Sequence, residues 1–214
     1  MIFDDLSRHG VVPVIAIDDA AAALPLADAL IAGGLPVAEI TFRTAAARDA
    51  IAAIAAHRPQ MILGAGTVLD EAQVDASVAA GARFALSPGL DGAVLEHARA
   101  RGLPFAPGIM TPSDVQAALR AGCGMVKFFP AVAAGGPAML KSIAAPYAHT
   151  GLGFNPTGGV TLETLGDWLS IPEVRAVGGT WIATRADIAA GNWDRIAANA
   201  RAAVAAVARI RGTA

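Results

Sequence analysis

Cysteine, lysine and aromatic residues are scarce in this 214-residue chain, and what is scarce narrows the possible functions. The sole cysteine, Cys123, excludes a disulfide within the chain and fits a reducing, cytoplasmic compartment. A formal net charge of −2, without a basic stripe, argues against nucleic acid as a partner. The four histidines lack the spacing of metal ligands, so we expect no metal site.

Long apolar runs are also missing, although the mean hydropathy is +0.52. Every stretch of 18 residues contains polar, charged or helix-breaking side chains, so we expect no membrane span. The chain starts with acidic residues and shows no apolar signal segment. These features predict a cytoplasmic protein without a membrane partner.

Short apolar runs alternate with alanine-rich helical stretches from one end of the chain to the other. The expected strands span residues 11–17, 37–42, 61–65, 83–86, 104–106, 125–129, 153–155 and 175–177. The expected helices span residues 20–32, 44–57, 70–80, 91–101, 112–121, 137–145, 161–170 and 192–210, with N-caps at Asp70, Asp91, Ser113 and Thr161. Eight such alternations predict an α/β fold: one (β/α)8 TIM barrel over residues 1–214, with a short N-terminal helix at 2–9. An open, doubly wound sheet is the alternative.

One of the 16 basic residues stands where a cation is unexpected. Only Lys127 and Lys141 are lysines, and Lys127 lies within the apolar run MVKFFP at 125–130. A buried ammonium must be paired or lose its proton, and a neutral amine is what a Schiff-base enzyme needs. The alternative is a strand-end lysine that extends its amine to water.

The second expected strand carries a carboxylate in an otherwise mostly apolar run, VAEITF at 37–42. The two-residue alternation of a strand places Glu39, Thr41 and Arg43 on one face. Glu39 is therefore the candidate for proton transfer, and Arg43 for binding an anion. A simple ion pair between Glu39 and Arg43 is the alternative.

Glycines follow several expected strands, where they allow the backbone to approach a ligand. GAGT at 64–67 adds the hydroxyl of Thr67 after the third strand. PTGG at 156–159 and GGT at 178–180 follow the seventh and eighth strands, the usual phosphate-binding position in such barrels. We interpret these two glycine pairs, with Thr180, as a phosphate site.

Two longer motifs resemble the signatures of the KDPG/KHG aldolase family, class I lyases that act on 2-keto-3-deoxy-6-phosphogluconate and 4-hydroxy-2-oxoglutarate. GLPVAEITFR at 34–43 is similar to the first signature. The segment 122–135, with VKFFPA at its centre, is similar to the second, which surrounds the Schiff-base lysine. Shorter blocks at 64–68, 87–89 and 156–159 match in the same order, so the resemblance covers about residues 5 to 205.

The resemblance implies a role for each candidate residue and requires no cofactor. Lys127 would be the nucleophile and Glu39 the acid/base, while Arg43 and Thr67 would bind the pyruvate carboxylate. Pro88 and Phe129 would line the pyruvyl pocket. The residues expected to hold the phosphate are Gly158, Gly159, Gly179 and Thr180. Two departures bear on the phosphate: Thr180 replaces the usual serine, and residues 16–18 (AID) lack the basic residue that some members carry there.

The implied activity is cleavage of a 2-keto-3-deoxy phosphosugar acid to pyruvate and glyceraldehyde 3-phosphate by a homotrimer. A preference for 4-hydroxy-2-oxoglutarate or for the galactonate epimer is the alternative within the lyases. A phosphate-binding barrel without catalysis is the alternative from another class. A metal-dependent phosphosugar epimerase fits less well because its metal ligands are missing.

Overall fold

A computed structural model describes residues 2–213, while Met1 and Ala214, the ends of the predicted domain, lie outside the described residues. The strands are β1 (Val11–Ile15), β2 (Val37–Thr41), β3 (Ile62–Gly66), β4 (Phe84–Leu86), β5 (Phe105–Ala106), β6 (Gly108–Ile109), β7 (Met125–Phe128), β8 (Gly153–Pro156) and β9 (Val177–Gly179). All assigned pairs between them are parallel.

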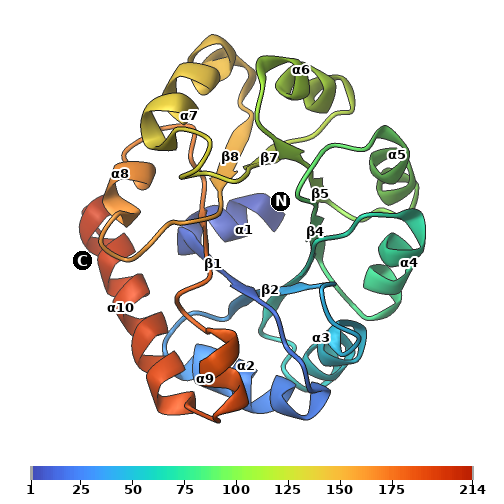
Figure 1. Cartoon of the computed structure of the whole chain (residues 1–214), viewed down its shortest axis with the longest axis vertical. Coiled ribbons are helices and arrows are strands. Elements are labelled where there is room, and N and C mark those ends of the chain that lie inside the picture. The colour runs from blue at the N-terminus through green and yellow to red at the C-terminus, as the bar shows by residue number, and fades with distance from the viewer. Residues whose placement is uncertain (1, 214) are drawn as a thin grey trace.

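Helices connect the strands and surround them (Figure 1). The α-helices are α1 (Ile2–His9), α2 (Ala23–Ala32), α3 (Ala47–His57), α4 (Glu71–Ala79), α5 (Gly92–Ala100), α6 (Pro112–Arg120), α7 (Gly136–Ala144), α8 (Leu165–Leu169), α9 (Arg185–Ala189) and α10 (Trp193–Arg211). Two 3₁₀ helices, η1 (Ala20–Ala22) and η2 (Ala145–Thr150), precede α2 and follow α7. Among the described residues, no helix is long and apolar enough to cross a membrane.

The parallel strands curl into an α/β fold of the kind that the sequence predicts, in two laddered parts. Six strands form one sheet in the order β5-β4-β3-β2-β1-β9, and three form another in the order β6-β7-β8. The expected fifth strand, 104–106, corresponds to β5, while β6 lies beyond Pro107 in a segment that the sequence did not predict to be a strand. Single bridges, Phe154↔Val174 and Thr157↔Gly178, connect the β8 region to the segment that contains β9.

Helix α1 covers the amino-terminal ends of the strands, as the sequence predicts. Leu6 is fully buried and accepts a hydrogen bond from the N–H of Gly10 just before β1. From the last turn of α10, the guanidinium of Arg211 donates to the carbonyl groups of Ser7 and Arg8. The two ends of the chain are thereby joined at this face, which leaves the carboxyl ends of the strands open for a site.

Capping side chains mark the starts of α4, α5, α6 and α9, and the N-cap positions correct two sequence assignments. Asp70 and Asp91 accept backbone N–H groups at the starts of α4 and α5, as expected. Helix α6 begins at a capping box formed by Thr111 and Asp114, because Thr111 lies three residues before Asp114 and Ser113 does not. Helix α8 has Thr164 at its N-cap position, so Thr161 is not its cap.

Because Gly64 has no side chain, the ring of Phe84 can pack against its backbone. A Cβ added to Gly64 on β3 would lie 2.3 Å from the ring of Phe84, a fully buried residue of β4. A residue with a side chain at this position would therefore have to displace Phe84, and well-packed interiors resist such shifts.

We expect Gly64→Ala to lower the free energy of unfolding by about 1–3 kcal/mol, because the added methyl group overpacks the interior. Urea titration followed by circular dichroism measures this. The matched control is Gly92→Ala at the exposed start of α5, where an added Cβ meets nothing within 4 Å. We expect this control to be neutral or to stabilise by up to about 1 kcal/mol. Equal stability of the two variants would contradict the packing argument.

Candidate active site

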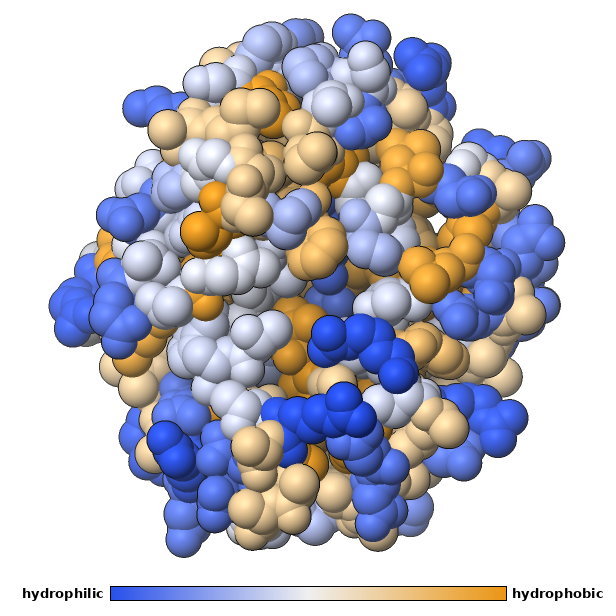
Figure 2. Space-filling model, viewed as in Figure 1, coloured by the Kyte–Doolittle hydropathy of each residue, from blue (hydrophilic) through white to orange (hydrophobic). Residues whose placement is uncertain are grey.

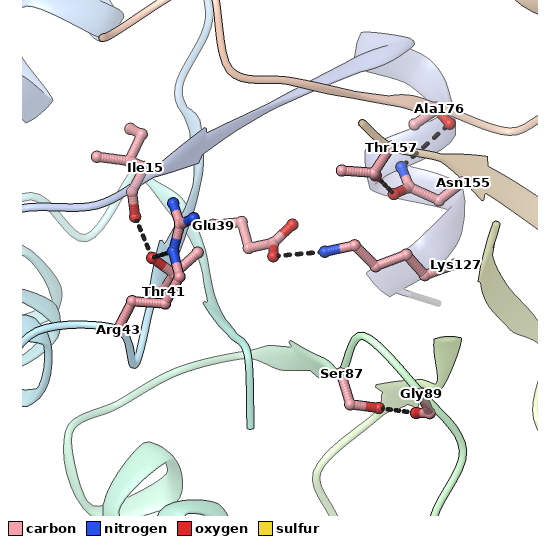
Figure 3. Close-up of polar contacts among 10 residues, drawn as sticks. All are labelled: Ile15, Glu39, Thr41, Arg43, Ser87, Gly89, Lys127, Asn155, Thr157 and Ala176. Carbon is pink, nitrogen blue, oxygen red and sulfur yellow. Dashed lines mark hydrogen bonds and ion pairs between the residues drawn. The ribbon is translucent and has the colours of Figure 1, made fainter. Parts of the chain in front are cut away.

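A buried amine and a buried carboxylate meet among the strands (Figure 3). Lys127 on β7 and Glu39 on β2 are 4% and 0% exposed. The Nζ of Lys127 donates a hydrogen bond of 3.1 Å to Oε1 of Glu39. Figure 3 shows the two side chains extending toward one another from opposite sides. The structure thus pairs the two residues that the sequence singled out separately.

This pair decides between the alternatives that the sequence left open. Lys127 does not extend its amine to water, because its Nζ is bound to a buried carboxylate. Glu39 pairs with Lys127, so the alternative pair of Glu39 with Arg43 is wrong. Arg43 is exposed and donates from Nε to the hydroxyl of Thr41, at 3.1 Å. Burying two charged groups is costly unless each has its partner, and the contact between Lys127 and Glu39 meets this requirement.

The glycine at the end of β3 creates the space for the carboxylate. Thr41 of β2 is opposite Gly66 of β3 in the parallel ladder, and a Cβ on Gly66 would lie 2.1 Å from Oε1 of Glu39. The other carboxylate oxygen, Oε2, is buried and has no hydrogen-bond partner among residues 2–213. Such an acceptor is costly to leave unpaired, so it indicates a place for a hydroxyl group of a ligand or for water.

The residues expected to bind a carboxylate lie at the carboxyl ends of β2 and β3. The hydroxyl of Thr41 donates to the carbonyl of Ile15 at 2.9 Å and accepts from Nε of Arg43, which orients that guanidinium. Thr67 is half-buried directly after β3 and has a φ of 56°, a left-handed conformation that is uncommon for threonine. Such a conformation at the end of a strand is typical of functional sites.

The expected pocket residues lie on two further strand ends. The ring centroid of half-buried Phe129 is 5.7 Å from Nζ of Lys127, which places an aromatic face beside the amine. Pro88 is half-buried after β4, and a Cβ on Gly108 would lie 2.0 Å from its carbonyl oxygen. This close approach of backbones holds the Pro88 turn against β6.

Two buried polar residues beside the lysine were missed by the sequence interpretation. In the ladder between β7 and β8, Asn155 is opposite Lys127. Its amide donates to the carbonyl of Ala176, and its Oδ1 accepts from the hydroxyl of Thr157 (Figure 3). The available signal was their two-residue spacing in an otherwise apolar strand. Because both are hydrogen-bonded, they stiffen the wall next to Lys127.

The two glycine turns come together at the ends of β8 and β9. The bridge between Thr157 and Gly178 places these turns next to one another. Gly158 and Gly159 have φ values of 102° and 81°, which favour glycine. Within residues 2–213, the N–H groups of Gly159 and Thr180 donate to no other group. Unpaired N–H groups from adjacent turns are suited to binding an anion.

Metal binding is not supported by the side chains present. Residues 2–213 contain no group of three or more His, Cys, Asp or Glu residues that could hold a metal ion.

Comparisons with known proteins agree on one family. The family model described as KDPG and KHG aldolase matches residues 2–199. The chain is 43% identical over 197 residues to the 2-dehydro-3-deoxy-phosphogluconate aldolase of Treponema pallidum, which covers 92% of this chain and 93% of that protein. It is 43% identical over 199 residues to the KHG/KDPG aldolase of Escherichia coli, covering 93% and 92% of the two chains.

A solved structure with a similar fold carries a trapped intermediate. The KDPG aldolase of Legionella pneumophila, with pyruvate captured as a covalent carbinolamine, has a TM-score of 0.90 and 39% identity to this chain. The similarity covers 94% of this chain and 97% of that one.

The cysteine lies at the other end of the strands from Lys127. Cys123 precedes β7 and lines a cavity of about 500 Å³ under α1, together with Phe3 and Arg175. It is half-buried, and burial raises the pKa of its thiol from 9.0 to about 11. A raised pKa lowers the thiolate fraction, so this thiol is not an activated nucleophile.

We expect Cys123 to react with a disulfide reagent such as DTNB at pH 8 about 100-fold more slowly than free glutathione, because the thiolate is the reactive form. Absorbance at the reagent's thiol band gives the rate. Unfolding the protein in urea should abolish the difference. A folded-state rate equal to that of glutathione would show that burial does not control this thiol.

Proposed function

This chain belongs to the KDPG and KHG aldolase family, and from that premise we propose that it cleaves 2-dehydro-3-deoxy-6-phosphogluconate to pyruvate and glyceraldehyde 3-phosphate. The observation that carries the proposal is the buried contact of 3.1 Å between Nζ of Lys127 and Oε1 of Glu39. A class I aldolase needs an amine that can lose its proton and a base that can accept it, and this contact supplies both.

The first half of the reaction forms the imine. A proton moves from Nζ of Lys127 to Glu39, which leaves a neutral amine and a neutral acid in a buried site. The amine adds to the C2 carbonyl carbon of the substrate, and Glu39 returns its proton to the oxygen. Loss of water then gives a protonated imine, which draws electrons from C3.

The second half breaks the carbon–carbon bond. Glu39, directly or through a water molecule, takes the proton of the C4 hydroxyl as the C3–C4 electron pair moves toward the imine nitrogen. Glyceraldehyde 3-phosphate leaves, and Glu39 then protonates the enamine at C3. Addition of water to the imine releases pyruvate and restores the amine. The unpartnered Oε2 of Glu39 supports a position for that hydroxyl or water.

The substrate has a carboxylate at one end and a phosphate at the other, and we propose a binding group for each. We assign the substrate carboxylate to Arg43 and Thr67, with Pro88 and Phe129 lining the pyruvyl group. The free N–H groups of Gly159 and Thr180, at the ends of β8 and β9, support our assignment of the phosphate to Gly158, Gly159, Gly179 and Thr180. These donors favour a phosphorylated substrate over 4-hydroxy-2-oxoglutarate, which ends in a carboxylate.

The setting of the reaction is also part of the proposal. We propose that residues 1–214 form one catalytic domain whose strands close as a (β/α)8 barrel. The family resemblance supports a homotrimer, and the single cysteine supports a cytoplasmic location. A designed protein cage built from symmetric oligomeric domains includes a chain 29% identical to this one.

Borohydride reduction in the presence of pyruvate should attach one reduced pyruvyl group permanently to Lys127, because the imine it forms becomes a stable amine. Peptide mass spectrometry locates the added mass. Lys141, exposed on α7, is the only other lysine and serves as an internal control that should stay unmodified. An unmodified Lys127, or equal labelling of both lysines, would refute the Schiff-base assignment.

Glu39→Gln should lower kcat by about 10²–10⁴-fold with a much smaller change in KM, because glutamine keeps the shape of the side chain but cannot carry a proton. Steady-state cleavage of the phosphogluconate substrate, coupled to pyruvate reduction, measures this. Glu96→Gln on the exposed surface of α5 is the control and should match the wild type. An unchanged kcat for Glu39→Gln would remove Glu39 from the proton transfers.

A further inference from the structure

A second group of cations lies outside the buried lysine, at the ends of β1 and β9. A cavity of about 390 Å³ is lined there by Val14, Ala16, Arg43, Thr180, Ala183, Thr184 and Arg185. These residues supply two guanidinium groups and two hydroxyl groups, and none of them is acidic. Figure 2 shows strongly hydrophilic side chains crossing this face over the ends of β1 and β2. Such a lining is suited to an anion.

Arg185 was not singled out by the sequence, because it begins a helix that the sequence did not predict, α9. Its Nε and Nη2 both donate to the carboxylate of Asp18, which follows β1. The arginine and aspartate side chains are 65% and 48% exposed. An exposed ion pair contributes little net free energy, because water solvates both partners well. The pair can therefore open when a stronger anion arrives.

The ion pair of Arg185 with Asp18 brings a cation to the end of the first strand. The segment that follows β1, residues 16–18, contains no basic residue of its own. Arg185 supplies a cation at this strand end from α9. Arg185 also shares its cavity with Thr180, whose free N–H is next to the glycine turns.

We infer that Arg185 binds the phosphate group of the substrate and that Asp18 holds the guanidinium in place until the phosphate replaces it. This inference rests on the proposed function, since it assumes a phosphorylated substrate. The planar guanidinium offers two parallel N–H donors, which match two phosphate oxygens as well as they match the two carboxylate oxygens of Asp18. The exchange keeps Arg185 paired throughout, and the phosphate is then held by Arg185 together with the N–H groups of Gly159 and Thr180.

The test compares two substrates that differ only in the phosphate group, 2-dehydro-3-deoxy-6-phosphogluconate and unphosphorylated 2-dehydro-3-deoxygluconate. Arg185→Ala should lower kcat/KM for the phosphorylated substrate about 10- to 100-fold, mainly through KM. The same variant should leave kcat/KM for the unphosphorylated substrate unchanged. Inorganic phosphate should inhibit the wild type competitively, and this inhibition should weaken by a similar factor in Arg185→Ala.

Two further variants separate phosphate binding from a structural role of the ion pair. Asp18→Asn keeps Arg185 but removes the negative charge that it is bound to. For this variant, kcat/KM for the phosphorylated substrate should equal or exceed that of the wild type. If the ion pair had only a structural role, Asp18→Asn and Arg185→Ala would lower kcat/KM by similar factors. The matched control is Arg58→Ala, since Arg58 at the end of α3 forms the same two-bond contact with Asp28 within α2. Arg58→Ala should leave kcat/KM unchanged for both substrates.

The outcomes distinguish this inference from the proposed function. A wild-type protein that cleaves the phosphorylated substrate, combined with an Arg185→Ala variant of unchanged kcat/KM, overturns the role of Arg185 alone. Equal losses on both substrates overturn it as well. A wild-type protein without activity on the phosphorylated substrate overturns the proposed function, and the phosphate role of Arg185 with it.

Discussion

The contact between Lys127 and Glu39 is the constraint on which the rest of the site depends, because neither charged group could be buried without the other. It requires β2 and β7 to present these side chains at the same depth, although 88 positions separate them in the chain. It also requires an empty space where Gly66 has no Cβ. The packing of the interior is thus arranged around one proton-sharing pair.

The molecule places its lysine and its arginines at the site in different surroundings. Lys127 is buried, where we propose that its amine forms a bond to carbon. The two arginines lie at the exposed carboxyl ends of the strands, where their permanent charge and paired N–H donors are suited to carboxylate and phosphate groups. Arg43 and Arg185 are both exposed and line one cavity, while Lys127 is buried beyond them. A substrate with anionic groups at both ends fits this division, because its ketone must reach the interior while its phosphate stays near water.

Much of the fold and of the candidate site was predictable because local patterns encode it. The alternation of apolar runs and helical stretches predicted nearly every strand, and Asp70 and Asp91 marked helix starts by a bond within three residues. The errors fell where elements are short or where a partner is distant in the chain. β6 and α9 were missed because a two-residue strand and a five-residue helix show too little periodicity. The role of Asn155 was missed because its amide donates to Ala176, which lies 21 positions away.

The sequence by itself determined the chemistry of this protein: a lysine in an apolar strand, a carboxylate in another, and glycine turns after the last two strands. The tertiary structure alone decided the partners. It paired Glu39 with Lys127 instead of with Arg43, its neighbour in the chain, and it brought Arg185 to Asp18 across 167 positions. The physical reason is that residue type and spacing set what a side chain can do, whereas its partner depends on the parallel register and closure of the sheet. Lys127 therefore has the same intrinsic chemistry anywhere, but it has a base beside it only in this fold.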